Sequence, residues 1–413
     1  MKLDGLAQRA LFVSALAASS FTARGAFAEP KVNDQAAPGV PVAPGVPSAK
    51  GAPAAPPSDK KEEAPPDDDG WPDLSSFLDE KYGFLPIAMP ITEPAIGYGV
   101  AGGLAFINQP FGAAAQGLGR PNVTFVGGFG TENGTWGVAA LDMRHWMHDH
   151  VQTLVGFVYA SVNLDFHGIG EDSVLEDNPI RYNLQPTGGL ANVKYRFGDT
   201  LLWAGLGYLF ARTEVSVDSP DDRPRLPDYD DASNIASLTL AGTFDSRDNF
   251  FTPTKGFYAE ASFSPYAKWL GGDENFERVA FTAIEYLPLP FGLYLGLRED
   301  VQAAFNDPPF YLKPYIGLRG VPIMRYQGDE IAQAEAELRW QFYGRLSLVG
   351  FAGAGLTWND FGWGNDTSNV FSGGGGFRYE LARRYGLHMG VDVAASRDTT
   401  AFYIQVGGAW MRP

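Results

Sequence analysis

The chain contains 413 residues and no cysteine, and it carries a formal net charge of −17 together with 50 glycines, 30 prolines, 29 phenylalanines, 18 tyrosines and 9 tryptophans. The lack of cysteine excludes disulfide bonds and every thiolate metal site. The acidic charge, without any cluster of Lys and Arg, argues against nucleic acid or an anionic lipid surface as a partner, because binding to phosphates requires clustered basic residues.

The first 28 residues have the organisation of a secretory signal peptide. Lys2 and Arg9 precede an apolar stretch over residues 10–23, and AFA at 26–28 follows as a small-residue cleavage site. We therefore expect cleavage after Ala28. No later stretch reaches the ~18 apolar residues that a membrane-spanning helix needs, so a mature chain that spans a membrane must do so as a closed β-barrel.

Residues 29–70 predict a disordered, Pro/Ala-rich tether in the periplasm. The stretch APGVPVAPGVPSAKGAPAAPPSDKKEEAPPDDDG contains almost no side chain that could be buried, and such a composition favours an extended, partly polyproline-like linker. A short lead-in follows at residues 71–83. Within it, Asp73 is a suitable N-cap for a short helix over residues 73–81 that presents three large apolar side chains on one face.

From residue 84 onward the sequence predicts strand after strand of an all-β fold. The clearest example is residues 332–342, where Ala, Leu, Trp and Phe side chains alternate without a break with Gln, Glu and Arg side chains. The predicted strands have about ten residues or more, which at a tilt of about 45° crosses a bilayer and exceeds the five or six residues usual in globular sheets. A soluble β-sandwich or propeller also explains the alternation, but it explains neither this strand length nor the signal peptide.

The alternation assigns the two faces of these strands. A charged residue that faces lipid at mid-bilayer costs about 2 to 4 kcal/mol, and a slip of one residue exchanges the two faces. We therefore expect Glu335, Glu337 and Arg339 to point into a polar lumen. The same reading of the strands at 291–305 and 402–410 places Phe291 and Trp410 on the apolar face.

The connections between predicted strands alternate between short turns, expected in the periplasm, and long acidic segments, expected outside the cell. This pattern predicts a transmembrane antiparallel β-barrel of about 16 strands over residues 84–413, with both ends of the barrel chain in the periplasm. The first strand is the least regular, because it contains Pro86 and Pro90.

The stretch DSRDNFFTPTKG at 245–256 interrupts this pattern between two long strands. Asp245 and Asp248, on either side of Arg247, can accept hydrogen bonds from nearby backbone amides. Pro253 cannot continue a hydrogen-bonded ladder, and Gly256 permits the positive φ from which the next strand restarts. The stretch therefore predicts a tight periplasmic turn.

The order of this turn, DSRDN followed by FTPTKG and an alternating strand, resembles the bacterial surface antigen barrel of the BamA and TamA outer-membrane assembly superfamily. The segment at 308–329, PPFYLKPYIGLRGVPIMRYQGD, is similar to the long sixth external loop of that superfamily. Four other segments carry the likeness: AEAELRW at 334–340 and VGFAGAG at 349–355, which resemble the next two strands, and PITEPAIGYG at 90–99 and FHGIG at 166–170, which resemble stand-alone members. The resemblance covers residues 84–410.

In barrels of this kind the sixth external loop folds back into the lumen, and its arginine pairs with acidic groups of the wall. The resemblance therefore implies that Arg319 and Gly320 form the lumenal motif of this loop. Inward-facing Glu335 and Glu337 are the expected partners, since a buried guanidinium needs a carboxylate to offset its desolvation. Many members have an aspartate where this chain has Gly353, so Arg319 has lost one customary partner.

The sequence also departs from the superfamily near its two ends. Full translocases of the superfamily carry periplasmic POTRA modules, whereas the stretch of about 55 residues after Ala28 is too short and too rich in Pro to form one. Residues 411–413 follow Trp410, whereas such barrels usually end at the aromatic residue. We therefore expect the short form without POTRA modules, with a weakened C-terminal assembly signal.

Other kinds of chemistry have little support. His145, His148 and His150 form the only histidine cluster and could converge on a metal, but turns at a barrel rim commonly carry such residues, and we expect no metal site. No nucleophile stands beside a histidine in the order that a barrel hydrolase needs, so we expect no catalytic residue, no enzyme activity and no cofactor. The glycines at 373–376 serve either the close approach of the lumenal loop or strong barrel curvature.

These observations predict an outer-membrane barrel that contacts outer-membrane lipid and a periplasmic or client protein. By resemblance it would assist the insertion or translocation of proteins or lipids, using a weak seam between the first and last strands as a lateral opening. Two alternatives stay open: a transport pore whose acidic lumen and loops favour cations, and a surface-interaction barrel whose acidic loops bind partners.

Overall fold

The computed structural model describes residues 69–80, 83–107, 122–168, 175, 178–217, 229–359 and 367–411. Every element described below lies within residues Trp71–Pro413. The predicted signal peptide, nearly all of the predicted tether and parts of the long acidic segments lie outside the described residues.

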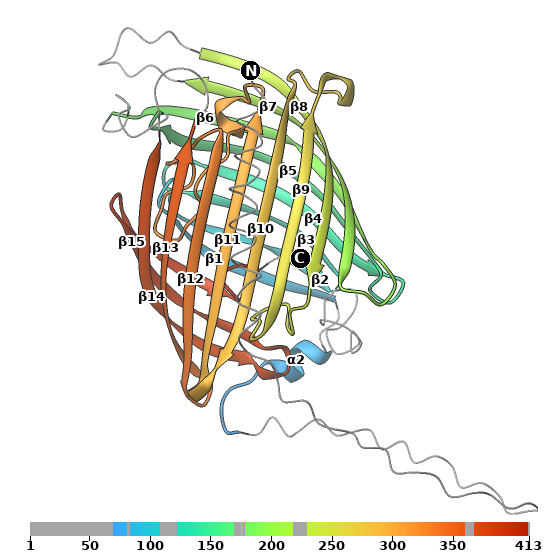
Figure 1. Cartoon of the computed structure of the whole chain (residues 1–413), viewed down its shortest axis with the longest axis vertical. Helices are drawn as coiled ribbons and strands as arrows, with labels where there is room; N and C mark the ends of the chain where they lie inside the picture. The colour runs from blue at the N-terminus through green and yellow to red at the C-terminus, as the bar shows by residue number, and fades with distance from the viewer. Residues whose placement is uncertain are drawn as a thin grey trace, which may run out of the picture. The chain divides into compact units, whose positions relative to one another are not determined.

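Sixteen strands form one sheet in which each strand pairs antiparallel with the next in sequence, and the sheet curls into a barrel (Figure 1). The strands are β1 (Gly83–Glu93), β2 (Gly97–Ile107), β3 (Val123–Thr131), β4 (Trp136–Trp146), β5 (Val151–Phe166), β6 (Ile180–Arg196), β7 (Leu202–Val217), β8 (Tyr229–Asp245), β9 (Gly256–Tyr266), β10 (Phe276–Leu289), β11 (Leu293–Phe305), β12 (Glu330–Tyr343), β13 (Leu346–Trp358), β14 (Ser368–Ala382), β15 (Leu387–Ser396) and β16 (Thr400–Val406). The prediction of an all-β antiparallel barrel of about 16 strands is therefore confirmed.

Among the described residues, the helical elements are few and short. The α-helix α2 (Ser75–Glu80) precedes the barrel, and four 3₁₀ turns lie between strands: η3 (Lys268–Leu270), η4 (Pro290–Gly292), η5 (Phe310–Leu312) and η6 (Arg383–Tyr385). Within the described ranges, no helix is long and apolar enough to span a bilayer.

Strand β12 buries charged side chains and exposes large apolar ones. On β12, Glu335 and Arg339 are buried, whereas Leu338 and Trp340 are exposed. Because side chains of a strand point alternately to the two faces of the sheet, this strand has the register that its sequence pattern predicts, with charged groups inside and an apolar surface outside.

Two predicted strand ends are wrong. Phe291 is not part of β11 but lies in η4 with a φ of 65°, where its side chain is 90% exposed. The last strand stops at Val406, and Gly407 turns the chain with a φ of 80°. Trp410 therefore leaves the apolar face on which alternation places it and is only 6% exposed.

The first strand is regular despite its prolines. Each of the eleven residues of β1 faces a residue of β2 in unbroken register, including Pro86 opposite Leu104 and Pro90 opposite Val100. The two prolines are four residues apart, so their nitrogens lie on the same edge of the strand. Proline is tolerated in a strand where its nitrogen does not face a hydrogen-bonding neighbour. We therefore infer that the nitrogens of Pro86 and Pro90 lie on the edge of β1 that faces away from β2.

The lead-in segment is fixed to one end of the barrel. We call this end the short-turn end, because it carries the tight β8–β9, β10–β11, β12–β13 and β14–β15 connections. In Figure 1, α2 lies below it. Asp73 accepts a hydrogen bond from the Ser75 amide at the start of α2 and forms an ion pair with Arg345, which is fully buried. The Leu74 amide donates to the Leu381 carbonyl at 2.9 Å.

This contact predicts an acid-sensitive lead-in. Burial disfavours the charged form of Asp73, but hydrogen bonds from Ser75, Arg345 and the Arg383 amide outweigh it and lower the pKa of the Asp73 carboxyl from 3.8 to about 2. Because the folded-state pKa lies below the unfolded one, the stabilisation is fully present above about pH 4 and is lost as the pH falls through about 2.

Pepsin, which works throughout this acid range and cleaves beside Leu and Phe, can report the release of Leu74 and Phe77. We expect the wild-type lead-in to resist cleavage near pH 4 and to be cleaved near pH 2, and we expect Asp73→Asn to be cleaved at both. Cleavage in the exposed β4–β5 turn serves as the reference for pepsin activity. Equal resistance of the two proteins near pH 4 would show that the ion pair does not hold the segment.

Candidate functional site

The turn motif at 245–256 is built around two aspartates. Asp245 accepts hydrogen bonds from Nε and Nη2 of Arg247, each at 2.9 Å, and the Arg247 guanidinium lies 4.6 Å from the centre of the Tyr258 ring. Asp248 accepts hydrogen bonds from the amides of Thr254 and Lys255 at 2.9 and 3.2 Å. These contacts close the turn that the sequence predicts.

Gly256 at the end of this turn cannot be replaced without strain. Its φ is 111°, and a Cβ atom at this position would lie 2.3 Å from the carbonyl oxygen of Ser246. A side chain would therefore both require an unfavourable backbone conformation and collide with the opposite strand of the turn.

The same turn also holds two distant segments. Asn249 Nδ2 donates to the Tyr385 carbonyl at 2.7 Å, which joins the turn to η6, and the Phe251 carbonyl accepts from the Gly408 amide at 2.5 Å. Leu78 of α2 packs against Tyr385, with Phe251 beside them. The turn motif thus connects the lead-in, the β14–β15 turn and the C-terminal tail, a role that its local sequence does not reveal.

The connection between β11 and β12, residues 306–329, crosses the interior of the barrel, and we call it the inner loop. Near its start, Phe310 packs with Leu164 of β5 and Tyr182 of β6, and the Tyr311 hydroxyl lies 2.7 Å from Ser233 Oγ of β8. Near its tip, Ile316 and Leu318 lie against Gly355 and Gly353 of β13. A loop that touches β5, β6, β8 and β13 has to lie inside the barrel.

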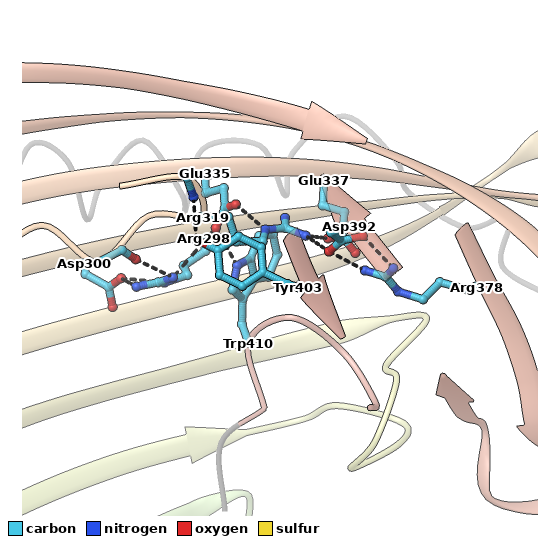
Figure 2. A network of polar contacts seen from close by, with 11 residues as sticks. Arg298, Asp300, Arg319, Glu335, Glu337, Arg378, Asp392, Tyr403 and Trp410 are labelled. Carbon is cyan, nitrogen blue, oxygen red and sulfur yellow. Dashed lines mark hydrogen bonds and ion pairs between the residues drawn. The ribbon is translucent and has the colours of Figure 1, made fainter. Parts of the chain in front are cut away.

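Arg319 lies near the middle of the inner loop and is surrounded by carboxylates (Figure 2). Its Nε donates to Glu335 Oε1 at 2.7 Å, and its Nη1 lies 2.7 Å from Glu337 Oε2 and 3.0 Å from Asp392 Oδ2. Its guanidinium also stacks 3.5 Å from the centre of the Phe351 ring. The arginine therefore ties the inner loop to β12, β13 and β15.

Gly320 brings the loop backbone against the wall. Its amide donates to the Tyr403 hydroxyl of β16 at 3.0 Å, and a Cβ atom there would lie 3.0 Å from the Ala395 nitrogen. The glycine is thus required both for its φ of 84° and for this close approach.

Asp392 is a further carboxylate partner of Arg319 and was not among the predicted site residues. A side chain at Gly353 would meet Leu318 of the inner loop at 3.0 Å, so the loop occupies that space. Asp392 is fully buried and also accepts two hydrogen bonds from Arg378, at 2.6 and 2.8 Å. The sequence signal that could have identified Asp392 is its position between Val391 and Val393, because alternation then places the aspartate on the inward face.

The glycines at 373–376 make room for the neighbouring strand. A Cβ atom at Gly374 would lie 2.1 Å from the Val393 carbonyl oxygen, and one at Gly376 would lie 1.8 Å from Asp392 Oδ1. The predicted close approach of the inner loop is therefore not what these glycines serve, because the atoms that approach Gly374 and Gly376 belong to β15 and to Phe351.

Glu335 joins the inner loop to the C-terminal tail. Its Oε1 binds Arg319, and its Oε2 accepts a hydrogen bond from the Trp410 indole at 2.8 Å (Figure 2). The Trp410 ring packs with Tyr258 and Ile284, and it fills the space in which a side chain at Gly296 would stand. One buried carboxylate therefore fixes two segments that come from opposite sides of the site.

The histidine cluster lies in the turn between β4 and β5. His148 has a φ of 55°, and Nδ1 of His150 lies 2.9 Å from the Met147 carbonyl oxygen. In the part of the chain that the structure describes, no group of three or more His, Asp and Glu side chains could hold a metal ion.

Comparison with known proteins gives consistent results. A model of the Omp85 superfamily domain matches residues 144–394. BamA from Haemophilus ducreyi lacking POTRA domains 1-3 is similar, with a TM-score of 0.54 at 13% identity over 79% of this chain and 70% of that chain. CdiB from Escherichia coli gives a TM-score of 0.52 at 12% identity over 80% of this chain, which spans 60% of the length of CdiB. No curated protein sequence matches the chain. At these low identities, the comparisons show that this chain shares the barrel fold of BamA and CdiB.

Proposed function

The chain belongs to the Omp85 superfamily and is an outer-membrane β-barrel, and from this premise we propose that it assists the insertion or translocation of client proteins, or of lipid, at the outer membrane. We further propose that this role is not enzymatic and that the opening lies between β1 and β16. The observation that carries the proposal is that the seam between β1 and β16 lacks a hydrogen-bonded ladder.

β1 and β16 are the two ends of the sheet and lie beside each other, but within the described strands no hydrogen-bonded ladder joins them. β16 has seven residues against the eleven of β1, and Pro86 and Pro90 remove two donors from the edge of β1 that faces away from β2. Unpaired strand edges are where another chain can add, so a weakly joined seam suits reversible opening.

The inner loop favours this proposal rather than the alternative of a steadily open transport pore. It crosses the interior from the wall at β5 and β6 to the wall at β13 and β15, and Arg319 holds it there through two buried carboxylates. A wide cation channel would require this loop to leave the lumen, which would strip Arg319 of its partners at a cost of several kcal/mol.

Depletion of the protein in its native organism tests the role. We expect the folded levels of other outer-membrane proteins, or the lipid composition of the outer leaflet, to fall and to recover when the wild-type chain is supplied again. Unchanged protein levels and unchanged lipid composition would contradict the proposal.

Because the chain has no cysteine, a disulfide can test the seam separately. A cysteine at Ala88 of β1 can be combined with single cysteines along β16, and the pair Ala88→Cys/Gly102→Cys, which face each other in the β1–β2 ladder, is the matched control. We expect oxidised seam pairs to lose complementation and to regain it on reduction, while the control pair complements in both states. Full complementation by the locked seam would exclude lateral opening.

A further inference from the structure

Four consecutive residues of the inner loop, 323–326, lie across the seam between β1 and β16, and we call them the seam clasp. On one side, the Ile323 amide donates to Oε1 of Glu93, the last residue of β1, at 3.1 Å. On the other side, the Tyr326 hydroxyl donates to Oδ2 of Asp398 at 2.6 Å. Asp398 lies in the turn from β15 to β16, so neighbouring residues of one loop hold opposite sides of the seam.

The clasp is fixed on the β1 side by packing as well as by this hydrogen bond. Met324 packs in the cluster around Leu164 and Tyr182, which also holds Ala95 and Ile96 of the β1–β2 turn. The Tyr182 hydroxyl lies 3.7 Å from the Met324 sulfur. Met324 has a φ of 62°, a left-handed conformation that is unfavourable for a residue with a side chain. Such a conformation persists only where the surrounding contacts impose it, so the clasp is held in one shape by its neighbours.

On the β16 side, the clasp is held by a polar group that is largely shielded from water. Arg325 Nε lies 3.3 Å from Asp398 Oδ1, and the Asp398 side chain is only 14% exposed. Tyr326 is 5% exposed, and its hydroxyl accepts a hydrogen bond from Arg397 Nε at 2.7 Å. Hydrogen bonds to a charged group are stronger than those between neutral groups, and shielding from water strengthens them further. Asp398 therefore ties the clasp to the turn that leads into β16.

The clasp lies where strand pairing is missing. β1 is joined to β2 by a ladder along its whole length, whereas within the described strands no ladder joins β1 to β16. The β1–β2 hairpin can therefore move away from β16 as one unit unless another part of the chain holds it. Residues 323–326 supply such a hold, because they bind the end of β1 and the turn before β16 at the same time.

We propose that the seam clasp keeps β1 against β16 at the end of the barrel opposite the short-turn end, with Glu93 and Asp398 as its positioning residues. This inference rests on the proposed opening between β1 and β16 and adds the contacts that control it. When residues 323–326 leave Glu93 and Asp398, the β1–β2 hairpin is free to move outward, and its edge becomes available to a client strand. Arg319 docks the same loop a few residues before the clasp, so a loop that leaves the lumen also releases the seam.

The test measures the seam in the purified full-length protein in lipid nanodiscs, by electron spin resonance distances between two nitroxide labels. Because the chain has no cysteine, Ala88→Cys on β1 and Leu338→Cys on the outer face of β12 give a pair that lies across the seam. Leu240→Cys with Leu338→Cys is the control pair, since hydrogen-bonded neighbours connect β8 to β12 without a gap. We expect Glu93→Ala to raise the population at longer seam distances by about tenfold, as for the loss of a hydrogen bond to a charged group.

Three further substitutions make the test specific. Glu93→Gln keeps an acceptor oxygen for the Ile323 amide, so it should retain most of the closed population. Glu214→Ala removes a half-exposed carboxylate of β7 and should leave the seam unchanged. Should Glu93→Ala fail to fold, Tyr326→Phe tests the other side of the seam and should give the same longer distances. Wild-type seam distances in Glu93→Ala and Tyr326→Phe, or an equal shift of the control pair, would overturn the proposal.

The result can be separated from that of the proposed function, because the distances are measured without a client. A seam that opens in Glu93→Ala, together with no effect of depletion on the outer membrane, would support the clasp and contradict the proposed role. A depletion effect, together with wild-type seam distances in Glu93→Ala, would support the role and contradict the clasp.

Discussion

Replacing Arg319 with alanine should lower the free energy of unfolding of the barrel by about 3 to 5 kcal/mol, because removing one partner of a buried ion pair leaves the other charge uncompensated. The arginine contacts Glu335, Glu337 and Asp392, and the first and last of these are buried. Asp392 keeps Arg378, so we expect Glu335 and Glu337 to bear most of the loss. The measurement is the denaturant dependence of the compact barrel form on semi-native gels.

Two substitutions accompany this experiment. Arg212→Ala removes an arginine whose ion pair with Glu214 is about half exposed, and such pairs contribute about 0 to 1 kcal/mol. Arg319→Lys keeps the charge but loses the planar fork that reaches several carboxylates, so it should fall between alanine and the wild type. If Arg319→Ala is no less stable than Arg212→Ala, the inner loop is not held by this arginine.

Replacing Trp410 with alanine should cost about 3 to 5 kcal/mol, as expected for deleting a large buried ring. Trp410→Phe separates packing from polarity, because it keeps a ring in the space beside Gly296 but loses the hydrogen bond from the indole to Glu335. A hydrogen bond to a charged group contributes about 1.5 to 3 kcal/mol, so phenylalanine should recover only part of the loss. Thermal unfolding in lipid nanodiscs measures both.

Trp340→Phe is the matched control, since Trp340 is exposed on the outer face of β12. It should change stability little. A double-mutant cycle of Arg319→Ala and Trp410→Phe gives a further readout: because both side chains bind Glu335, the two losses should not add. Additive losses, or a Trp410→Phe protein as stable as Trp340→Phe, would place the tryptophan outside this network.

The sequence by itself determined the architecture, because the main constraint on a membrane barrel, an apolar lipid-facing side on every strand, applies to individual residues. Lipid excludes charge from one face of every strand, so alternation along residues 332–342 gives both the strand and its register without knowledge of its neighbours. The turn at 245–256 was equally readable, since Asp248 and Gly256 act on backbone groups within the same short stretch. Arg319 could be singled out only through family resemblance.

Tertiary structure decided what each group contacts across the barrel. Alternation placed Trp410 on the lipid face, but the chain turns at Gly407, and Glu335, 75 residues earlier, takes its indole. Likewise, Leu318 of the inner loop fills the space beside Gly353, and Arg319 reaches Asp392 on β15 instead. Such pairings depend on how the barrel closes, and no local pattern encodes which inward groups of distant strands will meet.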